Sequence, residues 1–305
     1  MKHMAGHWTN DCTIVNGVVR FQDLAYLGIC EDELIEEKVP HGFIAEWDNG
    51  NWMEGGKLKW DIASMTVVKQ PKEQMIAIGE YGKAWLVGGG DRHEESIADG
   101  KISPKDRGTL RVVRAIEGQA YAAGMDRQVY RRDGKNQWTC IDESMRPSSR
   151  SNDVFGFEGI DGFSSKDIYA GGWNGEIWHY NGKKWVSCDS PTNLPLTNMI
   201  CGGDGKVYAC GRMGLLLQGK GNRWKVIEHE STEEDLWGLA WYEDKLWVAS
   251  MTQLYTLEKN KLGPVEFEDT QPETCYHLST ADGVLWSIGP KSVFAFDGNE
   301  WTHID

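Results

Sequence analysis

Residues 175–185 read Gly-Glu-Ile-Trp-His-Tyr-Asn-Gly-Lys-Lys-Trp. Asn-Gly is the strongest short signal for a β-hairpin, because both residues of its tight turn must accept a positive φ. The segment therefore predicts two short strands joined by a turn at Asn181-Gly182. Trp185 opens the second of these strands.

The same order of turn and tryptophan recurs in four other places. These are Asp48-Asn49-Gly50-Asn51-Trp52, Asp133-Gly134 before Trp138, Gly221 before Trp224, and Asp297-Gly298 before Trp301. Because five such hairpins are spread over the chain, they indicate a repeated architecture and not a local feature.

A second repeated feature is a short apolar segment that ends in a small residue, such as Tyr208-Ala209-Cys210-Gly211. These segments start at residues 76, 121, 169, 208, 247 and 286, so that successive starts are 45, 48, 39, 39 and 39 residues apart. A period of about 40 to 45 residues with several short strands in each period is typical of a propeller blade.

The repeats predict an all-β fold, a single β-propeller of seven four-stranded blades over residues 1–305. Residues 1–56 would form an irregular first blade with an acidic insertion at Glu31–Glu37, and residues 57–305 six regular blades. Six blades would result if residues 1–56 only complete the ring. Ring closure removes free sheet edges and requires the two ends to meet, for which Trp8-Thr9 and Trp301-Thr302 are the expected segments.

The composition fits this fold and disfavours one class of function, the binding of nucleic acid. The chain has 15 Trp and 36 Gly, which suits many small strands with tight turns, and most of the Trp are expected to pack between blades. The formal net charge of −14 disfavours binding to nucleic acid, which needs a positive face. An acidic surface keeps a protein soluble, and it also attracts basic partners.

The cysteines and the N-terminal residues point to a compartment. The seven Cys are an odd, scattered set without a C-x-x-C pair, which favours free thiols in a reducing compartment over a disulfide framework. Residues 1–8 lack the apolar core of a signal peptide, and no apolar run approaches the length of a membrane span. We therefore expect a cytoplasmic protein that does not contact the membrane.

The repeats resemble those of bacterial β-propellers with WD40-like or sialidase-type (BNR-like) repeats, over nearly the whole chain. Trp47-Asp48 and Trp60-Asp61 are similar to the Trp-Asp pair of WD40 repeats. The Gly-x-x-Trp half of the sialidase box S-x-D-x-G-x-x-W occurs at Gly182–Trp185 and Gly298–Trp301, whereas the Ser-x-Asp half is missing. The resemblance implies a rigid disc whose loops bind another molecule, most often a protein.

A search for motifs of catalysis or metal binding predicts no catalytic residue, no metal site and no cofactor. The chain has no H-E-x-x-H, G-x-x-x-x-G-K-[ST], G-x-S-x-G or EF-hand loop. Cys275 and His277 alternate and would lie on one face of a strand, but two ligands make only half a zinc site. The enzymatic alternative is a glycan hydrolase or lyase at the central channel, with Glu158 and Asp161 as its paired carboxylates.

The loops of one propeller face supply the predicted binding site. The connections from the second to the third strand of each blade share a face with those from the fourth strand to the next blade, where the acidic run Glu228–Asp235 lies. Trp, Tyr, Met and Arg are enriched in interface cores, and carboxylates suit a rim. The predicted partner-binding residues are Tyr81, Arg127, Trp173, Arg212, Met213, Glu233, Glu234 and Asp235.

The favoured function is a non-enzymatic, protein-binding propeller whose acidic loop face captures a basic protein partner. An immunity protein that neutralises a bacterial toxin is one specific form of this function, suggested by a stand-alone acidic propeller without a further domain. The alternatives are a face that is merely solvated and the glycan-processing enzyme described above. The sequence specifies neither the partner nor the oligomeric state.

Overall fold

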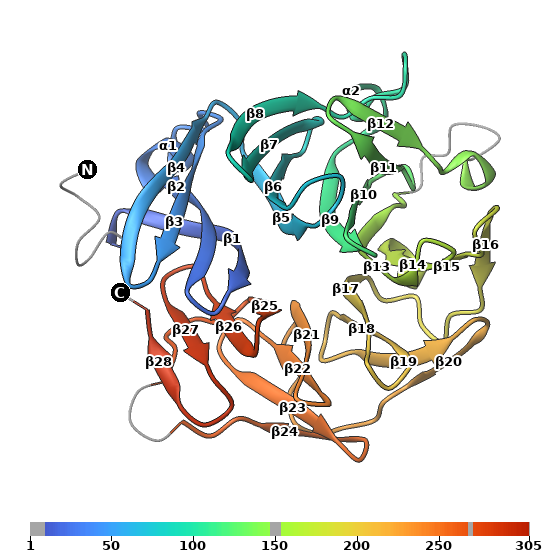
Figure 1. Ribbon diagram of the computed structural model, residues 1–305. Coiled ribbons are helices and arrows are strands. Elements are labelled where there is room, and N and C mark those ends of the chain that lie inside the picture. The colour runs from blue at the N-terminus through green and yellow to red at the C-terminus, as the bar shows by residue number, and fades with distance from the viewer. Residues whose placement is uncertain (1–9, 147–153, 268–270, 305) are drawn as a thin grey trace.

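The computed structural model describes residues 10–146, 154–267 and 271–304. In these residues the chain forms seven antiparallel sheets of four strands each. The sheets are arranged as blades around a central axis, with their first strands innermost (Figure 1). The predicted all-β propeller with seven blades is confirmed. The six-blade alternative is wrong, because residues 12–58 supply a complete blade of their own.

Each blade is built from one continuous segment. Blades one to four are β1 (Cys12–Phe21), β2 (Leu24–Glu31), β3 (Gly42–Asp48), β4 (Asn51–Leu58); β5 (Ile62–Val68), β6 (Gln74–Gly79), β7 (Lys83–Gly88), β8 (Asp91–Ser96); β9 (Leu110–Ile116), β10 (Gln119–Gly124), β11 (Val129–Gly134), β12 (Gln137–Cys140); β13 (Phe157–Ser164), β14 (Asp167–Gly172), β15 (Ile177–Tyr180), β16 (Trp185–Cys188). Blades five to seven are β17 (Leu196–Cys201), β18 (Val207–Gly211), β19 (Leu216–Lys220), β20 (Arg223–Val226); β21 (Gly238–Tyr242), β22 (Lys245–Ala249), β23 (Leu254–Glu258), β24 (Lys261–Pro264); β25 (His277–Ala281), β26 (Val284–Ile288), β27 (Val293–Phe296), β28 (Trp301–His303).

The helical elements of the described residues are short and lie in the connections. They are α1 (Asp32–Glu36), α2 (Pro104–Arg107), η2 (Glu143–Met145) and η3 (Trp173–Gly175). The helix α1 falls within the predicted acidic insertion, and its side chains are not buried. It therefore decorates the first blade without entering the core.

The hydrophobic core lies between the blades. Each large buried cluster draws its residues from two neighbouring blades, and the repeated tryptophans of the fourth strands join these clusters. Trp185 of blade four, for example, packs among Ile116, Tyr121 and Val129 of blade three. In blade two the corresponding hairpin position holds Arg92, which pairs with Val87, and in blade six it holds Leu262. The period therefore marks the packing surfaces as well as the strands.

The hairpin turns share a position in the repeat, but they differ in backbone geometry. At Asn49-Gly50 both residues have positive φ, 49° and 80°. At the 181–184 turn Gly182 has a φ of 85°, and Asn181 stays outside the left-handed region. The Asn181 side chain instead accepts hydrogen bonds from the backbone N–H groups of Lys183 and Lys184, both at 3.1 Å. The expected two-residue turn at Asn181-Gly182 was therefore wrong in detail, because two lysines lengthen the loop.

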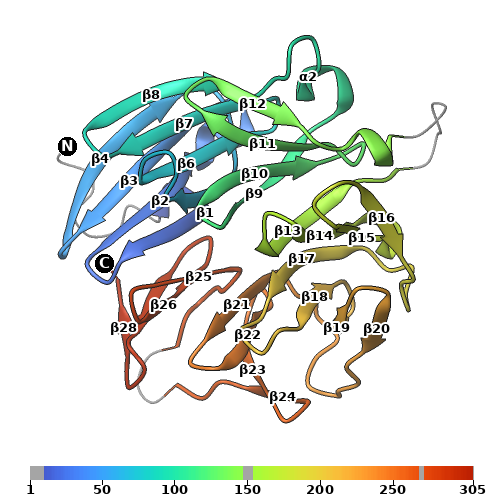
Figure 2. The same ribbon diagram turned by 45° about the vertical axis from the view of Figure 1, so that its right-hand side comes forward.

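The first and last blades close the ring by packing. β1 lies beside β25 and β26 (Figure 2), and in the described residues all four strands of each end blade come from one end of the chain. At this joint, backbone Ile14 N–H donates a hydrogen bond to Pro290 C=O at 3.0 Å. Ile14, Trp286 and Ile288 also belong to one hydrophobic cluster there. Trp8-Thr9, expected to meet Trp301-Thr302, lies outside the described residues.

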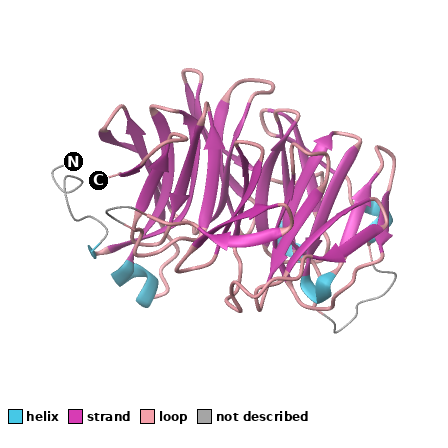
Figure 3. Cartoon of the chain, turned by 90° about the horizontal axis from the view of Figure 1, so that it is seen from below, coloured by secondary structure: helices cyan, strands magenta, loops and turns pink. Residues whose placement is uncertain are grey.

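The disc has two faces, seen edge-on in Figure 3. We call the linker face the one that carries the connections between blades and those between the second and third strands, such as 80–82, 173–176, 212–215 and 227–237. Backbone hydrogen bonds join the two kinds of connection, as from Leu110 N–H to Glu80 C=O at 2.7 Å and from Leu236 N–H to Gly211 C=O at 3.0 Å. The opposite face, which we call the hairpin face, carries the remaining turns.

Candidate partner-binding site

The structure places all eight predicted site residues on loops of the linker face, spread over blades two to six. Tyr81 and Met213 are exposed, at 63% and 69% of their surface. They lie in the equivalent loops of blades two and five, and so they belong to opposite parts of the rim. The predicted residues therefore do not form one patch, and they fall into the local groups described next.

Four of the predicted residues meet where blades five and six join. Backbone Met213 N–H donates to Asp235 Oδ1 at 2.9 Å, and Arg212 Nη1 lies 3.9 Å from Asp235 Oδ2. Glu234 accepts a hydrogen bond from the Thr252 hydroxyl at 2.9 Å. Both Glu234 and the adjacent Glu233 are exposed. Asp235 and Glu234 thus shape the loops, and Glu233 faces the solvent.

Arg127 is held within the protein. Its Nε donates to Glu176 Oε2 at 2.7 Å. Its guanidinium also stacks against Phe155 and Trp178, at 4.6 and 5.1 Å from their ring centroids. Arg127 was predicted as a binding residue, but these contacts give it a local structural role that joins blades three and four.

Trp173 is hydrogen-bonded to Glu158, which lines the central cavity. Its indole N–H donates to Glu158 Oε1 at 2.8 Å. The same carboxylate lies 3.6 Å from Arg111 Nε, and Arg111 Nη1 in turn lies 3.1 Å from Glu80 Oε1. Loops and first strands of three blades therefore converge here on a chain of alternating charges.

A recurrent β-bulge aims side chains into this mouth. The pairing of the first two strands skips one residue near its start in each of blades one to five, namely at Val15, Ala63, Arg111, Glu158 and Thr197. Trp237 and Tyr276 occupy the same position in blades six and seven, just before β21 and β25. All seven residues line the central cavity. Bulges commonly re-aim a side chain at a functional site.

We call these seven residues the mouth ring; no motif in the sequence predicted them as a group. In each repeat, the third residue of the apolar segment, such as Cys210 in Tyr208-Ala209-Cys210-Gly211, pairs with a residue of the first strand. The member of the mouth ring is the residue immediately before that partner. An alignment of the seven repeats would have brought these positions into one column. The bulge itself leaves no sign in the residue types, because a valine, an alanine, an arginine, a glutamate and a threonine all occupy it.

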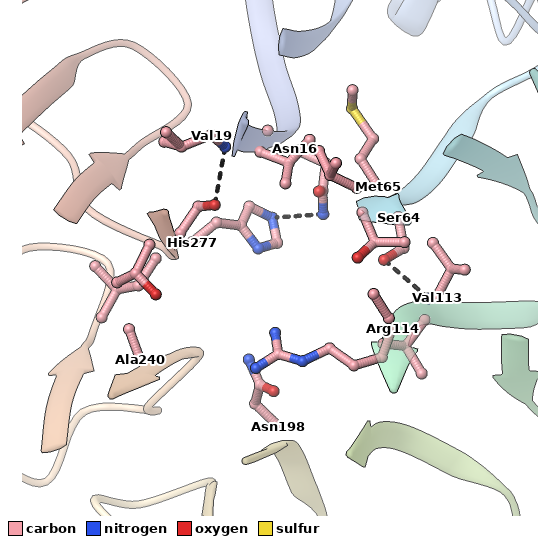
Figure 4. A pocket seen from close by; sticks show the side chains of 18 of the residues that line it. Asn16, Val19, Ser64, Met65, Val113, Arg114, Asn198, Ala240 and His277 are labelled. Atoms are coloured by element: carbon pink, nitrogen blue, oxygen red, sulfur yellow. Dashed lines mark hydrogen bonds between the residues drawn. The ribbon is translucent and has the colours of Figure 1, made fainter. Parts of the chain in front are cut away.

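The channel behind the mouth ring is a cavity of about 840 Å³ with mixed polarity. Asn16, Arg114, Asn198 and His277 point into it (Figure 4). Burial lowers the pKa of His277 to about 4, only partly offset by the Val15 carbonyl that its Nε2 contacts at 3.0 Å. His277 is therefore a neutral ring at physiological pH and forms part of the channel wall.

The two carboxylates of the enzymatic alternative are both engaged. Asp161 Oδ2 accepts from backbone Cys201 N–H at 2.8 Å and lies 3.4 Å from Arg114 Nη2. Backbone Gly162 N–H donates to its other oxygen at 2.9 Å. These bonds hold Asp161 in the channel wall, where it joins neighbouring blades. Its contacts therefore indicate a structural role.

The expected pairing of Cys275 and His277 on one strand face was wrong. Cys275 lies before β25 and packs in a hydrophobic cluster with Ala249 and Leu254, whereas His277 lines the channel. Strand alternation does not apply to Cys275 because the strand begins at His277. Within the described residues, His, Cys, Asp and Glu do not gather in any group of three or more suited to a metal ion.

No helix among the described residues is long and apolar enough to cross a membrane. All seven cysteines, each in the described part of the chain, are unpaired. Burial raises the pKa of Cys188 and Cys275 to about 11, which makes these thiols unreactive.

The described blades form a seven-bladed β-propeller whose fold resembles that of WD40-like propellers. Similar solved structures include virginiamycin B lyase from Staphylococcus aureus, with a TM-score of 0.69 and 10% identity over 93% of this chain and 94% of that one. The propeller domain of Doa1 gives a TM-score of 0.64 and 9% identity over 96% and 92% of the two chains. These likenesses show the fold alone.

A comparison of sequences identifies the family. The chain is 50% identical over 295 residues to Immune protein Tsi7 of Pseudomonas aeruginosa, and the match covers 95% of this chain and 96% of that protein. The chain belongs to the family of that immune protein. No family model matches it.

Proposed function

We propose that the protein is an immunity protein, which neutralises a bacterial toxin in the cytoplasm by binding it without chemistry. The observation that carries the proposal is the 50% identity to Immune protein Tsi7 over nearly the whole of both chains. The rigid disc supports it, because a preformed surface loses little entropy on binding. The partner is then a protein, and neither nucleic acid nor membrane takes part.

The test is neutralisation of the toxin encoded by the neighbouring gene. We expect that co-expression with this chain restores growth of cells that produce the toxin. In vitro, inhibition of the toxin should be complete at one equivalent of the protein and proportional to added protein below that. Complete inhibition by a small fraction of an equivalent would contradict binding without chemistry, because only a catalyst turns over. A toxin that is not inhibited at any ratio would overturn the proposed function.

We further propose that the linker face contacts the toxin and that its acidic residues speed association. Reversing the exposed Glu228, Glu230 and Glu233 to Lys should slow association roughly tenfold at low salt, because exposed charges steer diffusing partners. The dissociation rate should hardly change. Glu234 and Asp235 are left intact in this variant, because they bond the neighbouring loops. Stopped-flow association at two salt concentrations measures the effect.

The matched control reverses Glu54, Glu243 and Glu300, three exposed residues away from the linker face, which changes the net charge equally. An equal loss of association rate in both triple variants would show that net charge and not this face attracts the toxin. A linker-face variant with the wild-type salt dependence would place the interface elsewhere, and the hairpin face would become the better candidate.

The cytoplasmic location predicts seven free thiols in the protein purified from its native host. Titration with a thiol reagent after denaturation without reductant should find seven thiols per chain, the number of cysteines in the sequence. Several of these thiols are buried, so the folded protein should react with fewer. A count of five or fewer after denaturation would reveal disulfides and contradict the proposed compartment.

A further inference from the structure

The mouth ring is divided into a charged and an aromatic side. Blades three to five contribute Arg111, Glu158 and Thr197, and blades six and seven contribute Trp237 and Tyr276. The Trp237 and Tyr276 rings lie 5.2 Å apart at an angle of 33° and form one wall. Trp173 adds a third ring whose N–H group already binds the Glu158 carboxylate. The mouth therefore offers aromatic surface and negative charge to the same space.

The charges at the mouth do not cancel. Within the part of the chain that the structure describes, Glu80, Glu158 and Asp235 form ion pairs with two guanidinium groups, those of Arg111 and Arg212. The Nε of Arg111 is buried and has no hydrogen-bond partner in the described part of the chain, and its distance of 3.6 Å from Glu158 is too long for one. One negative charge is thus in excess, and Glu158 accepts the Trp173 N–H while lying beyond hydrogen-bond distance of Arg111 Nε.

The electrostatic effects on neighbouring groups agree with this excess. Burial raises the pKa of Glu158, and the Trp173 hydrogen bond with the charges of Arg111 and Arg212 offsets this only in part. Burial also raises the pKa of Tyr276, and the negative charge of Glu158 raises it further. Glu158 and Tyr276 both line the central cavity.

We propose that the mouth of the central channel is a socket for one arginine side chain, presented by a protruding loop of the toxin. The socket rests on the proposed function and specifies the contact that the linker face makes. A guanidinium group carries the missing positive charge and binds a carboxylate through two parallel N–H groups. Its flat faces stack on aromatic rings such as Trp237 and Tyr276. The cavity of about 840 Å³ below the ring leaves room for the side chain to enter.

Arginine fits the socket better than the other basic side chain. A lysine ammonium is a compact, strongly hydrated charge that gains less from a ring face and cannot form the paired hydrogen bonds. An acidic side chain would be repelled by Glu158. A neutral side chain would leave the excess negative charge buried under the partner, which is unfavourable.

The first experiment measures the affinity of the toxin for three forms of the protein by calorimetry. Glu158→Gln should raise the Kd at least 30-fold, because a charged pair buried at the centre of an interface is strongly coupled. Glu73→Gln is the matched control, since Glu73 lies at the opposite mouth and binds Arg20 Nε at 2.8 Å. Its Kd should stay within about twofold of wild type. Thermal melts of both variants should match wild type.

The second experiment tests the socket without the toxin. The probe is acetyl-Gly-Arg-Gly-amide, and the reporter is the indole N–H resonance of Trp173, assigned as the signal that Trp173→Phe removes. The arginine peptide should shift this resonance to saturation at millimolar concentration in wild type and have no effect in Glu158→Gln. The peptide with citrulline, a neutral analogue of arginine, should not shift it. The lysine peptide should bind more weakly than the arginine peptide.

The two experiments separate the socket from the function. A toxin that binds wild type and Glu158→Gln equally, together with a silent Trp173 signal, would overturn the socket and leave the immunity function intact. Saturable binding of the arginine peptide alone, with no toxin binding, would support the socket and overturn the function. Equal binding of the lysine and arginine peptides would overturn the assignment of arginine.

Discussion

Replacing Glu95 with Gln should lower the free energy of unfolding by about 3–5 kcal/mol. Glu95 lies fully buried between blades two and three, where both its oxygens accept from Arg132, at 3.0 and 2.8 Å. Its Oε2 also accepts the Trp138 indole N–H at 3.1 Å. The substitution leaves the Arg132 guanidinium charged, buried and without its counter-ion. Urea denaturation of wild type and variant measures the loss.

The matched control removes both charges, as Glu95→Leu with Arg132→Met. Apolar side chains of similar size can replace a buried ion pair at little cost, so the double variant should be more stable than Glu95→Gln. A double variant as unstable as the single one would show that the pair itself, and not an uncompensated charge, stabilises the joint.

The same carboxylate should make stability depend on pH. Burial alone would raise the pKa of Glu95, but the hydrogen bonds from Arg132 and His93 outweigh it and lower the pKa from 4.5 to about 2. A lowered pKa stabilises the fold above the unfolded value and ceases to do so as the pH falls toward the folded one. The stability of wild type should therefore drop between pH 4.5 and 2, and the drop should be smaller in the double variant.

Trp185→Ala should lower the free energy of unfolding by about 3–5 kcal/mol, as truncation of a buried large side chain leaves a cavity. Trp185 is 2% exposed and packs between blades three and four against Phe157 and Tyr180, with ring centroids at 6.3 and 5.3 Å. Its indole N–H also binds the Ile141 carbonyl at 3.0 Å. Chemical denaturation measures the effect.

The neighbouring residue supplies the control. Val186 lies on the same strand but is 43% exposed, so Val186→Ala should change stability by less than about 0.5 kcal/mol. If the two variants were equally stable, the recurrent spacing of the hairpin tryptophans would have nothing to do with packing between blades. Melting of Trp185→Ala in two separate transitions would instead show that the blades unfold independently.

The fold could be predicted from sequence because the residues that repeat with each blade are types with strict structural requirements. Placing them elsewhere in the fold would lower its stability. A tryptophan such as Trp185 needs a large apolar partner surface, and a glycine such as Gly50 supplies a positive φ that few residues adopt. Both recur in step with the blades. Register and packing therefore follow from the same repeated positions.

The contacts that the candidate site residues make could be predicted less completely, for a physical reason. Exposure and loop position suggested Arg127 and Asp235, but the structure shows both held by bonds within the protein. Loop residues of mixed charge usually find partners nearby, and single positions in a sequence do not reveal them. The mouth ring could not be predicted from residue types, because a bulge is a property of the pairing between two strands and not of the residue itself.

In the described residues the ring closes without a strand shared between its two ends, and this has a topological consequence. Each blade is folded from an uninterrupted stretch of chain, and the joint between the last and the first blade is made of the same kinds of contact as the other joints. A circularly permuted chain that began in the connection at 189–195, with its original ends joined, would contain every blade intact. The chain could thus be circularly permuted at any connection between blades. No sheet would lose the hydrogen bonds between its strands.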